Sequence, residues 1–353
     1  MTTRHVMTVR GPVNPKSIGF TTMHDHMFFD STAWWMPETF EDSEIAVQNL
    51  TVSNSGLARW NALGIRDNLL ISKDDYKTQL EEISAFAHAG GSCLVDPTCE
   101  GLSPQPLLLR QISMDLDLHV VAGSGIYVHN AHPKWVENAS LSEIETFIDR
   151  QVRIGIEGTD VLPGIIGEVG TSNPPSTREM LVVRAAARVG AATDTMVAVH
   201  LTTPGMHAPE IIDVMINEEI VADRIVLCHM DEVLNLEYHL AVLKRGAIVE
   251  FDTFGFEGYF ARLWKTPSDN EKMGFLVELL KLGYANQIVI GHDVALKCQL
   301  HRFGGLGYDH IPKRIIPTLV KHYSVNSSDI RALTIDNPRK LLSRAGTGLD
   351  FGA

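Results

Sequence analysis

Short runs of apolar, often β-branched residues recur along the chain and alternate with longer segments in which apolar residues follow a helical period. The eight candidate strands lie at residues 20–27, 92–98, 118–127, 164–170, 195–201, 224–230, 247–255 and 287–294. Helical patterns stand between them, for example at residues 76–90, 141–158, 177–193, 234–246 and 271–283. Several of these end in glycine, as helices commonly do. Repeated alternation of strand and helix predicts an α/β protein with a (β/α)8 TIM barrel.

An open, doubly wound sheet is the alternative architecture for this pattern. We favour the closed barrel because no candidate strand leads into a Gly-x-Gly-x-x-Gly turn and because eight units fit closure better. Such barrels routinely exceed about 250 residues, so we predict that residues 1–353 form one domain. The segment 28–75 is too long for an ordinary connection. It is predicted to be an insertion after strand 1 that caps the barrel mouth, and a long glycine-rich loop follows strand 8.

Net charge, apolar stretches and cysteine content limit which binding partners and which cellular location are expected. The net charge of −13 excludes a nucleic-acid backbone or an anionic membrane surface as the main partner. No apolar stretch reaches the roughly 20 residues that span a bilayer, and residues 1–15 lack the apolar core of a signal peptide. The four cysteines are scattered, which favours reduced thiols in a cytoplasmic protein.

Histidines and carboxylates gather at the carboxyl ends of the candidate strands, where barrel enzymes carry their active sites. They are His24 and His26 at the first strand, Glu168 at the fourth, His200 at the fifth, His229 at the sixth and Asp293 at the eighth. Glu168 stands close to the end of the apolar run GIIGEVG, and a buried, unpaired carboxylate there would cost several kcal/mol or shift its pKa until it is neutral. This raises the question of which group Glu168 pairs with.

The alternation of side chains along a strand fixes the direction of the two histidines at the first candidate strand. His24 and His26 point the same way while Asp25 faces the helices, so the pair can chelate one ion. A single histidine at a strand end is more often structural, but this set of six is not explained that way. Imidazole and carboxylate ligands suit Zn2+, Co2+, Mn2+, Ni2+ or Fe2+. Six ligands exceed the need of one tetrahedral ion and suggest two divalent ions, about 3.5–4 Å apart, that share a carboxylate and a water.

The order of these residues resembles the amidohydrolase superfamily and, within it, the phosphotriesterase-like family. The segments that carry the resemblance include TMHDHMFFD (22–30), AGSGIYV (122–128), GIIGEVG (164–170), HLTTPG (200–205), LCHMDEVLNLEY (227–238), VIGHDVALK (289–297), GGLGYDHI (304–311) and LTIDNPRKLLS (333–343). They span nearly the whole chain. The resemblance implies a hydrolase that acts on a small-molecule substrate, most simply with two Zn2+ ions, and dimers are common in the family.

The resemblance also implies how the ligands divide. His24, His26 and Asp293 would hold the more buried ion, and His200 and His229 the more exposed one. Many relatives bridge the ions with a carbamylated lysine, whereas this chain has Glu168 there, like the phosphotriesterase-related branch. A glutamate and a carbamate both end in two anionic oxygens, so the site should not depend on bicarbonate.

Three further roles follow from hydrolytic chemistry and the family pattern. Asp293 would accept the proton of the attacking water and pass it to the leaving group. Tyr127 matches a tyrosine near the metals in the lactonase branch, although packing beneath the insertion explains it equally well. Asp252 resembles a residue that relays protons outward. Thr253, which follows it, departs from the histidine of phosphotriesterases and the arginine of lactonases.

Other polar residues have simpler explanations. His292 should point away from the metals by strand alternation, and His129, His207 and His301 lie in loops that face the mouth. In the long loop after strand 8, Lys297, Arg302 and Tyr308 are candidates for binding an anionic substrate group, with solvated side chains as the alternative.

Hydrolysis of a lactone or carboxylic ester is the leading hypothesis, with weak promiscuous phosphotriesterase activity. An amidase for a small N-acyl compound is the second hypothesis. A metal-containing binding protein without catalytic activity is the third, and the intact Asp293 and ligand set argue against it.

Overall fold

The computed structural model describes residues 3–39 and 43–346, and eight parallel strands within them form a barrel. These strands are β3 (Thr21–Thr22), β6 (Cys93–Asp96), β7 (His119–Ala122), β8 (Ile166–Thr171), β9 (Val197–Leu201), β10 (Ile225–Leu227), β11 (Ile248–Phe251) and β14 (Ile288–Ile290). Each overlaps one of the eight predicted runs. The predicted (β/α)8 barrel is therefore confirmed.

Hydrogen bonds close the ring of strands. The pairing order is β3-β6-β7 in one sheet and β8-β9-β10-β11-β14 in the other. The two sheets are joined at one seam by the bond from Gly164 N to Ala122 O (2.9 Å) and at the other by the bond from Met23 N to Ile290 O (2.9 Å). Closure brings the carboxyl ends of all eight strands to one mouth.

The strands are buried on both faces, which explains why their sequences read as continuous apolar runs. All six residues of β8 are buried. Along β9 and β10, Ala198 and Val226 belong to the core cluster inside the barrel, whereas Val197 and Ile225 belong to the cluster packed beneath the helices. This alternation fixes which side chains at the strand ends point toward the barrel axis.

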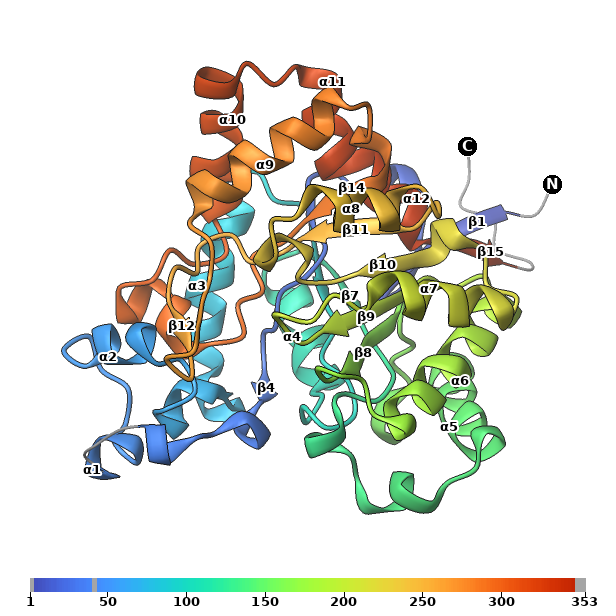
Figure 1. Ribbon diagram of the computed structural model, residues 1–353, viewed down its shortest axis with the longest axis horizontal. Coiled ribbons are helices and arrows are strands. Elements are labelled where there is room, and N and C mark those ends of the chain that lie inside the picture. Colours follow the sequence, from blue (N-terminus) through green and yellow to red (C-terminus); the bar gives the residue numbers. More distant parts are fainter. Residues whose placement is uncertain (1–2, 40–42, 347–353) are drawn as a thin grey trace.

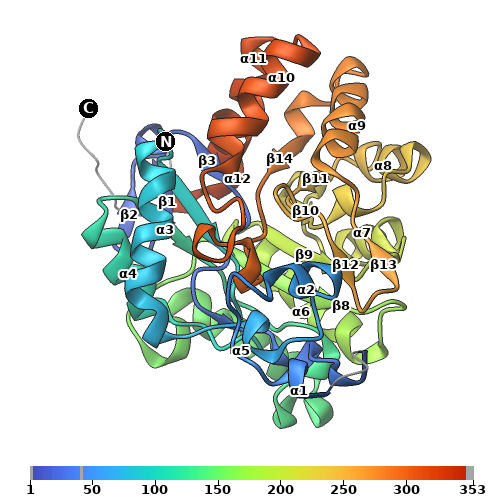
Figure 2. The ribbon, with the colours of Figure 1, turned by 90° about the vertical axis from the view of Figure 1, so that its left-hand side faces the viewer.

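A ring of helices surrounds the strands (Figure 2). The helices are α3 (Tyr76–His88), α4 (Pro106–Asp115), α5 (Leu141–Arg153), α6 (Thr177–Thr193), α7 (Ala208–Asn217), α8 (Leu236–Leu243), α9 (Asp269–Lys281), α10 (Ile316–Tyr323), α11 (Ser327–Arg331) and α12 (Asn337–Leu342). The predicted helical segments are confirmed: α6 has the predicted bounds, α3, α5 and α8 are shorter than predicted, and α9 begins and ends two residues earlier. Ser140, Ser176 and Ser268 begin α5, α6 and α9 with capping boxes, which satisfy the first free amides.

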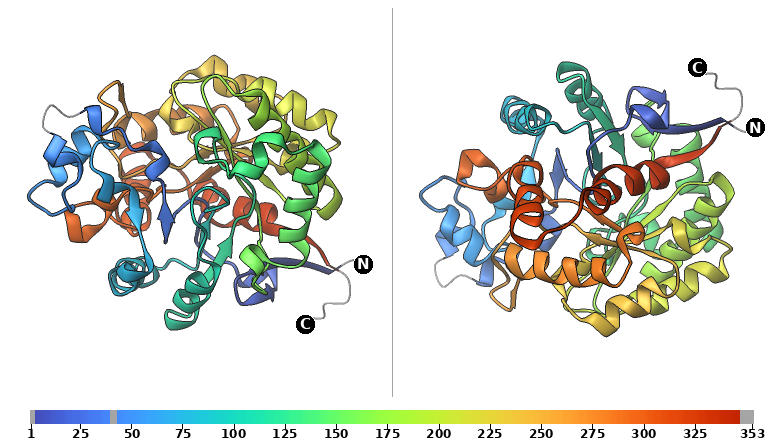
Figure 3. Two further views of the ribbon diagram at one scale, coloured as in Figure 1. Left: turned by 90° about the horizontal axis from the view of Figure 1, so that it is seen from below. Right: turned by 90° about the horizontal axis from the view of Figure 1, so that it is seen from above.

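The segment 28–75 lies at the opposite end of the molecule from β1 (Thr3–Thr8) and β15 (Ser343–Gly346), as predicted for a cap over the mouth (Figures 1 and 3). It contains α1 (Ser43–Ala46) and α2 (Ser55–Trp60), and β4 (Phe29–Asp30) pairs with β5 (Leu70–Ile71) at its base.

A hairpin that the sequence analysis did not predict joins this cap. Its strands are β12 (Tyr259–Phe260) and β13 (Trp264–Lys265), and it is bonded to the cap from Ala62 N to Tyr259 O (2.8 Å). The mouth is thus covered from two sides by segments far apart in the sequence.

Two simpler predictions can be compared with the fold. No helix in the described part of the chain is long and apolar enough to cross a membrane. All four cysteines are buried and unpaired, in agreement with the prediction of reduced thiols.

Candidate metal centre

The two histidines of the first strand converge. His24 and His26 lie just beyond β3, both are buried, and their Nε2 atoms are 3.3 Å apart. Asp25 between them turns away and binds His292 Nδ1 at 3.1 Å, while His292 Nε2 accepts a hydrogen bond from Ile311 N. The alternation predicted for this strand is present, and His292 has a structural position.

Glu168 on β8 faces both groups of histidines. Its Oε1 lies 3.2 Å from His26 Nε2, and its Oε2 lies 3.1 Å from His200 Nδ1 and 3.4 Å from His229 Nε2. Oε1 is nearest to His26 of the first pair, and Oε2 is nearest to the second pair but also lies 3.6 Å from His24 Nε2, so the carboxylate lies between both pairs. This is the geometry that a bridging carboxylate requires.

The second cluster comes from the ends of β9 and β10. His200 Nδ1 and His229 Nε2 are 2.8 Å apart, and both face Glu168. His229 has a left-handed backbone (φ 59°), which its neighbour Asp252 stabilises by accepting a hydrogen bond from His229 N at 2.9 Å. Two sets of donor atoms thus flank one shared acid.

Asp293 follows β14 and lies beside the first cluster. Its Oδ1 is 3.6 Å from His24 Nε2 and 3.5 Å from His26 Nε2. Within residues 3–39 and 43–346, this buried oxygen has no hydrogen-bond partner. The side chain is 19% exposed and reaches the cavity at the mouth, so it touches both the cluster and the space where a substrate can lie.

Hydrogen bonds behind the histidines fix their orientation. Asp252 is fully buried and lies 3.1 Å from both His24 Nδ1 and His229 Nδ1. His26 Nδ1 pairs with Thr98 Oγ1 at 2.7 Å, and His200 Nε2 pairs with Thr202 Oγ1 at 3.2 Å. A neutral imidazole has one N–H, and Asp252 holds it at Nδ1 of His24 and His229. The Nε2 atom of each ring then carries a lone pair that faces inward.

The buried carboxylates of the centre favour positive charge on the groups around them. Burial raises the pKa of Glu168, but the imidazoles of His24 and His200 outweigh burial and hold that pKa well below its usual range. Burial opposes charge on His24, yet Glu168 and other neighbours raise its pKa well above normal. Converging lone pairs, an anionic Glu168 and the unpartnered Asp293 Oδ1 fit two divalent cations, which would replace protons at these nitrogens.

Tyr127 lies against the second cluster. Its Oη is 3.4 Å from His200 Nδ1, the two rings meet edge to face at 4.9 Å, and the side chain lines the cavity. Burial raises the pKa of Tyr127 well above 10, so the phenol stays protonated and can donate a hydrogen bond.

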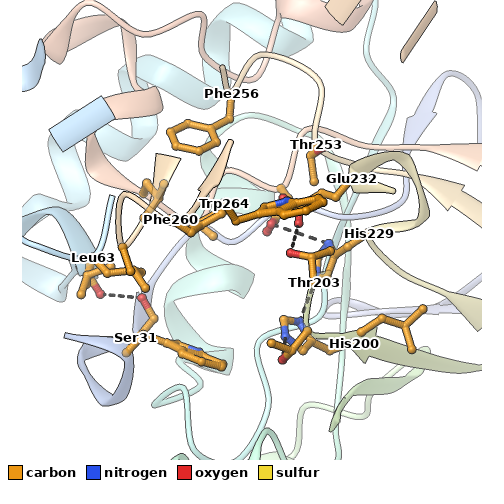
Figure 4. A pocket seen from close by; sticks show the side chains of 18 of the residues that line it. Ser31, Leu63, His200, Thr203, His229, Glu232, Thr253, Phe256, Phe260 and Trp264 are labelled. Atoms are coloured by element: carbon orange, nitrogen blue, oxygen red, sulfur yellow. Dashed lines mark hydrogen bonds and ion pairs between the residues drawn. The ribbon is translucent and has the colours of Figure 1, made fainter. Parts of the chain in front are cut away.

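A cavity of about 400 Å3 opens above the centre. Figure 4 shows His200 and His229 on one wall, with Phe256, Phe260 and Trp264 on another. Trp34 and Leu63 of the cap complete the walls. The space admits a small organic molecule and is largely apolar.

Three candidates for anion binding are wrong. Lys297 Nζ is paired with Asp67 at 2.8 Å, and Tyr308 is fully buried with its hydroxyl donating to the backbone of His26. Arg302 is exposed, and in the described part of the chain none of the three lines the cavity. In the loop after β14, Lys297 is therefore used for the ion pair with the cap, and Arg302 has the exposed position that a solvated side chain predicts.

The three loop histidines predicted to face the mouth also take no part in the cavity. His129 is exposed, His207 pairs with Asn173, and His301 pairs with Glu82. None of them is among the described residues that line the cavity.

The sequence analysis did not single out the residues of the cavity wall, and two of them are polar and stand close to predicted ligands. Glu232 and Thr203 lie in the loops after β10 and β9, and both line the cavity. The available signal was their position: each lies three residues beyond a predicted histidine ligand, on the loops that build barrel active sites.

Comparisons with known proteins agree with this geometry. The model of the phosphotriesterase family matches residues 4–342. The N-acetyltaurine hydrolase of Tetraodon nigroviridis is 31% identical over 346 residues, which cover 96% of this chain and 97% of that protein. The phosphotriesterase-related protein of Nematostella vectensis is 31% identical over 97% of this chain and 99% of its own length.

A solved structure is similar over the same span. A resiniferatoxin-binding protein from Rhodobacter sphaeroides superposes with a TM-score of 0.92 at 31% sequence identity, and the match covers 96% of this chain and 94% of that one. Family model, relatives and fold thus coincide over nearly the whole chain. The chain belongs to the phosphotriesterase family and is a metal-dependent hydrolase.

Proposed function

We propose that this enzyme hydrolyses a carboxylic ester or lactone at a centre of two divalent ions, most simply Zn2+. The observation that carries the proposal is Glu168, whose carboxylate lies between the His24–His26 pair and the His200–His229 pair beneath a largely apolar cavity. We assign His24, His26 and Asp293 to the inner ion. His200 and His229 belong to the outer ion in this assignment.

When bound, the ions lower the pKa of water and polarise the carbonyl group of a substrate. The chain's own residues handle the protons and the orientation. Asp293 reaches the cavity with an unpartnered oxygen, so it can accept a proton from water and deliver it to the leaving oxygen. Tyr127 Oη is positioned to donate a hydrogen bond to a substrate oxygen beside His200.

Asp252 has no direct contact with the cavity in this proposal. It lies behind His24, whose other nitrogen is 3.6 Å from Asp293. His229 Nδ1 also lies 3.9 Å from Asp293 and 3.1 Å from Asp252, so an outward relay of protons from Asp293 to Asp252 would pass through one of these two imidazoles. The primary task of Asp252 in this proposal is to hold His24 and His229.

Hydrolysis of an amide in a small N-acyl compound is the second candidate. It is favoured by the N-acetyltaurine hydrolases, to which this chain is 31% and 28% identical over 96% of its length. The same residues would serve, because an amine leaving group needs a proton even more than an alkoxide does. Phosphotriester hydrolysis is expected to be weak. This chain has Thr253 at the position where the resemblance places the histidine of phosphotriesterases.

The proposal is tested with protein of measured metal content against lactones, aryl esters, N-acyl amino acids and phosphotriesters. We expect turnover of esters or lactones with about two ions per chain. Asp293→Asn should keep its metal and lose about 100- to 10,000-fold in kcat, the usual contribution of a general acid–base group. Exclusive turnover of amides would favour the second candidate. Failure on every carbonyl substrate at full metal content would refute both.

A further inference from the structure

One acidic side chain on the cavity wall has no role in the proposed reaction. Glu232 ends the short turn Met230–Glu232 after β10, is 6% exposed and lines the cavity. Its Oε2 accepts a hydrogen bond from Thr203 Oγ1 at 2.5 Å (Figure 4). Within residues 3–39 and 43–346, Oε1 has no hydrogen-bond partner.

The positive charges that act on this carboxylate are those of His229, a predicted metal ligand, and Lys272, which does not line the cavity. Aromatic side chains of Trp34, Phe256, Phe260 and Trp264 surround the space, and no lysine or arginine in the described chain lines it. Lys272 is buried nearby, but its Nζ donates to the carbonyl oxygens of Thr253 and Phe256, and the side chain is not exposed.

The metal centre adds no surplus positive charge for a substrate. The carboxylates of the centre and of its cavity are Glu168, Glu250, Asp252, Asp293 and Glu232. They are at least as many as the four positive charges of two divalent ions. An anionic substrate group would therefore lose its hydration among aromatic walls without gaining a partner.

A substrate group that donates a hydrogen bond gains a partner in this cavity, unlike an anionic group. A hydroxyl, amide N–H or ammonium group can donate to Oε1 of Glu232, and hydrogen bonds to a charged acceptor in a dry site are among the stronger ones. An ammonium also gains from the aromatic faces beside it.

We propose that Glu232, held by Thr203, is the specificity-determining group of the cavity. It selects uncharged or cationic substrates that donate a hydrogen bond and excludes anionic ones. This inference rests on the proposed ester hydrolysis for its kinetic test. It also separates this chain from relatives named for N-acetyltaurine, a substrate that carries a sulfonate.

A purely structural role for Glu232 is the competing explanation. The bond to Thr203 joins the loops after β9 and β10, and that task alone requires no preference among substrate charges. The two explanations therefore differ in selectivity and not in stability.

The test uses phenyl acetates that carry a meta aminomethyl, hydroxymethyl or sulfonate group, with unsubstituted phenyl acetate as reference. A second series places the same groups on the acyl side, so that either orientation in the cavity is sampled. Each kcat/KM is divided by the rate constant of hydroxide-catalysed hydrolysis, which removes differences in intrinsic reactivity.

For the wild-type enzyme we expect the ammonium and hydroxymethyl esters to exceed the sulfonate by about 10- to 100-fold in at least one series, the range of one charge-assisted hydrogen bond. Glu232→Gln should reduce the ammonium-to-sulfonate ratio at least tenfold. Glu237→Gln, an equal change of charge at an exposed position of α8, should leave the ratio as it is. An unaltered ratio in Glu232→Gln, or a preference for sulfonate in both series, overturns the proposal.

Two further measurements separate a failure of this proposal from a failure of the proposed function. If Glu232→Gln does not fold, the ammonium-to-sulfonate ratio of the wild-type enzyme alone tests the role of Glu232. If no ester is hydrolysed at full metal content, the proposed function fails. Calorimetric binding of benzylammonium and benzenesulfonate to the metal-loaded wild type then tests the site by itself. Tighter binding of benzylammonium supports the role of Glu232, and tighter binding of benzenesulfonate refutes it.

Discussion

Replacing Asp252 by asparagine should weaken both metal positions at once. Asp252 accepts hydrogen bonds from Nδ1 of His24 and Nδ1 of His229, each at 3.1 Å, and from His229 N at 2.9 Å. These two histidines belong to different clusters around Glu168. An asparagine has one acceptor oxygen, so at least one imidazole loses the partner that fixes its N–H at Nδ1.

The size of the effect follows from the partners that are lost. Carboxylates behind metal-ligating histidines typically contribute 10- to 100-fold to metal affinity, which corresponds to about 1.4–2.7 kcal/mol for each ion. For Asp252→Asn we therefore expect the dissociation constant for the Zn2+ ion whose histidine loses its partner to rise by about 10- to 100-fold, and the other constant to rise less. Turnover at saturating metal should fall less than affinity, because the ligand atoms themselves remain.

The assay is a competition titration of metal-free protein with Zn2+ and a chelator of known affinity. Asp231→Asn is the matched control: Asp231 is buried in the neighbouring loop, its Oδ2 accepts from Thr253 N and Oγ1, and burial raises its pKa to about 7. Unchanged dissociation constants in a folded Asp252→Asn variant would refute the reasoning. An equal loss of Zn2+ affinity in Asp231→Asn would show that the effect comes from replacing any buried aspartate of this region by asparagine, and not from the contacts of Asp252.

Three further predictions concern single residues. Glu168→Ala should bind fewer than one ion per chain by elemental analysis, and bicarbonate should neither restore its metal nor alter that of the wild type; retention of two ions would remove Glu168 from the ligands. Tyr127→Phe should keep its metal and lose about tenfold in kcat/KM, the value of one hydrogen bond, and full activity would assign Tyr127 to packing. Burial lowers the pKa of His239 to about 4, so the unfolded chain takes up the proton first as the pH falls from about 6.5. The metal-free protein should lose up to about 3 kcal/mol of unfolding free energy between pH 7 and pH 4 through this residue. Urea unfolding of His239→Gln should show a smaller loss, and an identical pH dependence would contradict the assignment.

The arrangement of the candidate ligands was predictable because their positions depend on local rules. Period-two alternation aims His24 and His26 the same way and sends Asp25 to the opposite side, where it meets His292. Eight strands that close into a barrel then bring Glu168 and the later ligands to one mouth. Neither step requires knowledge of side-chain packing.

The cavity was not predictable in the same way. Its walls come from the cap, the hairpin β12–β13 and the loops after β9 and β10, which are brought together by contacts such as the bond from Ala62 N to Tyr259 O. Lys297 looked like a candidate for substrate binding until the fold paired it with Asp67, which is 230 residues away.

By itself, the sequence determined the barrel and the set of candidate metal ligands, because hydrophobic periodicity and position at a strand end are local properties of the chain. The tertiary structure decided that Asp252 supports two histidines at once and that Glu232 faces an apolar cavity that no described lysine or arginine lines. Those properties depend on distances between loops that close the barrel mouth, and such distances are set by packing between residues that are remote in the sequence.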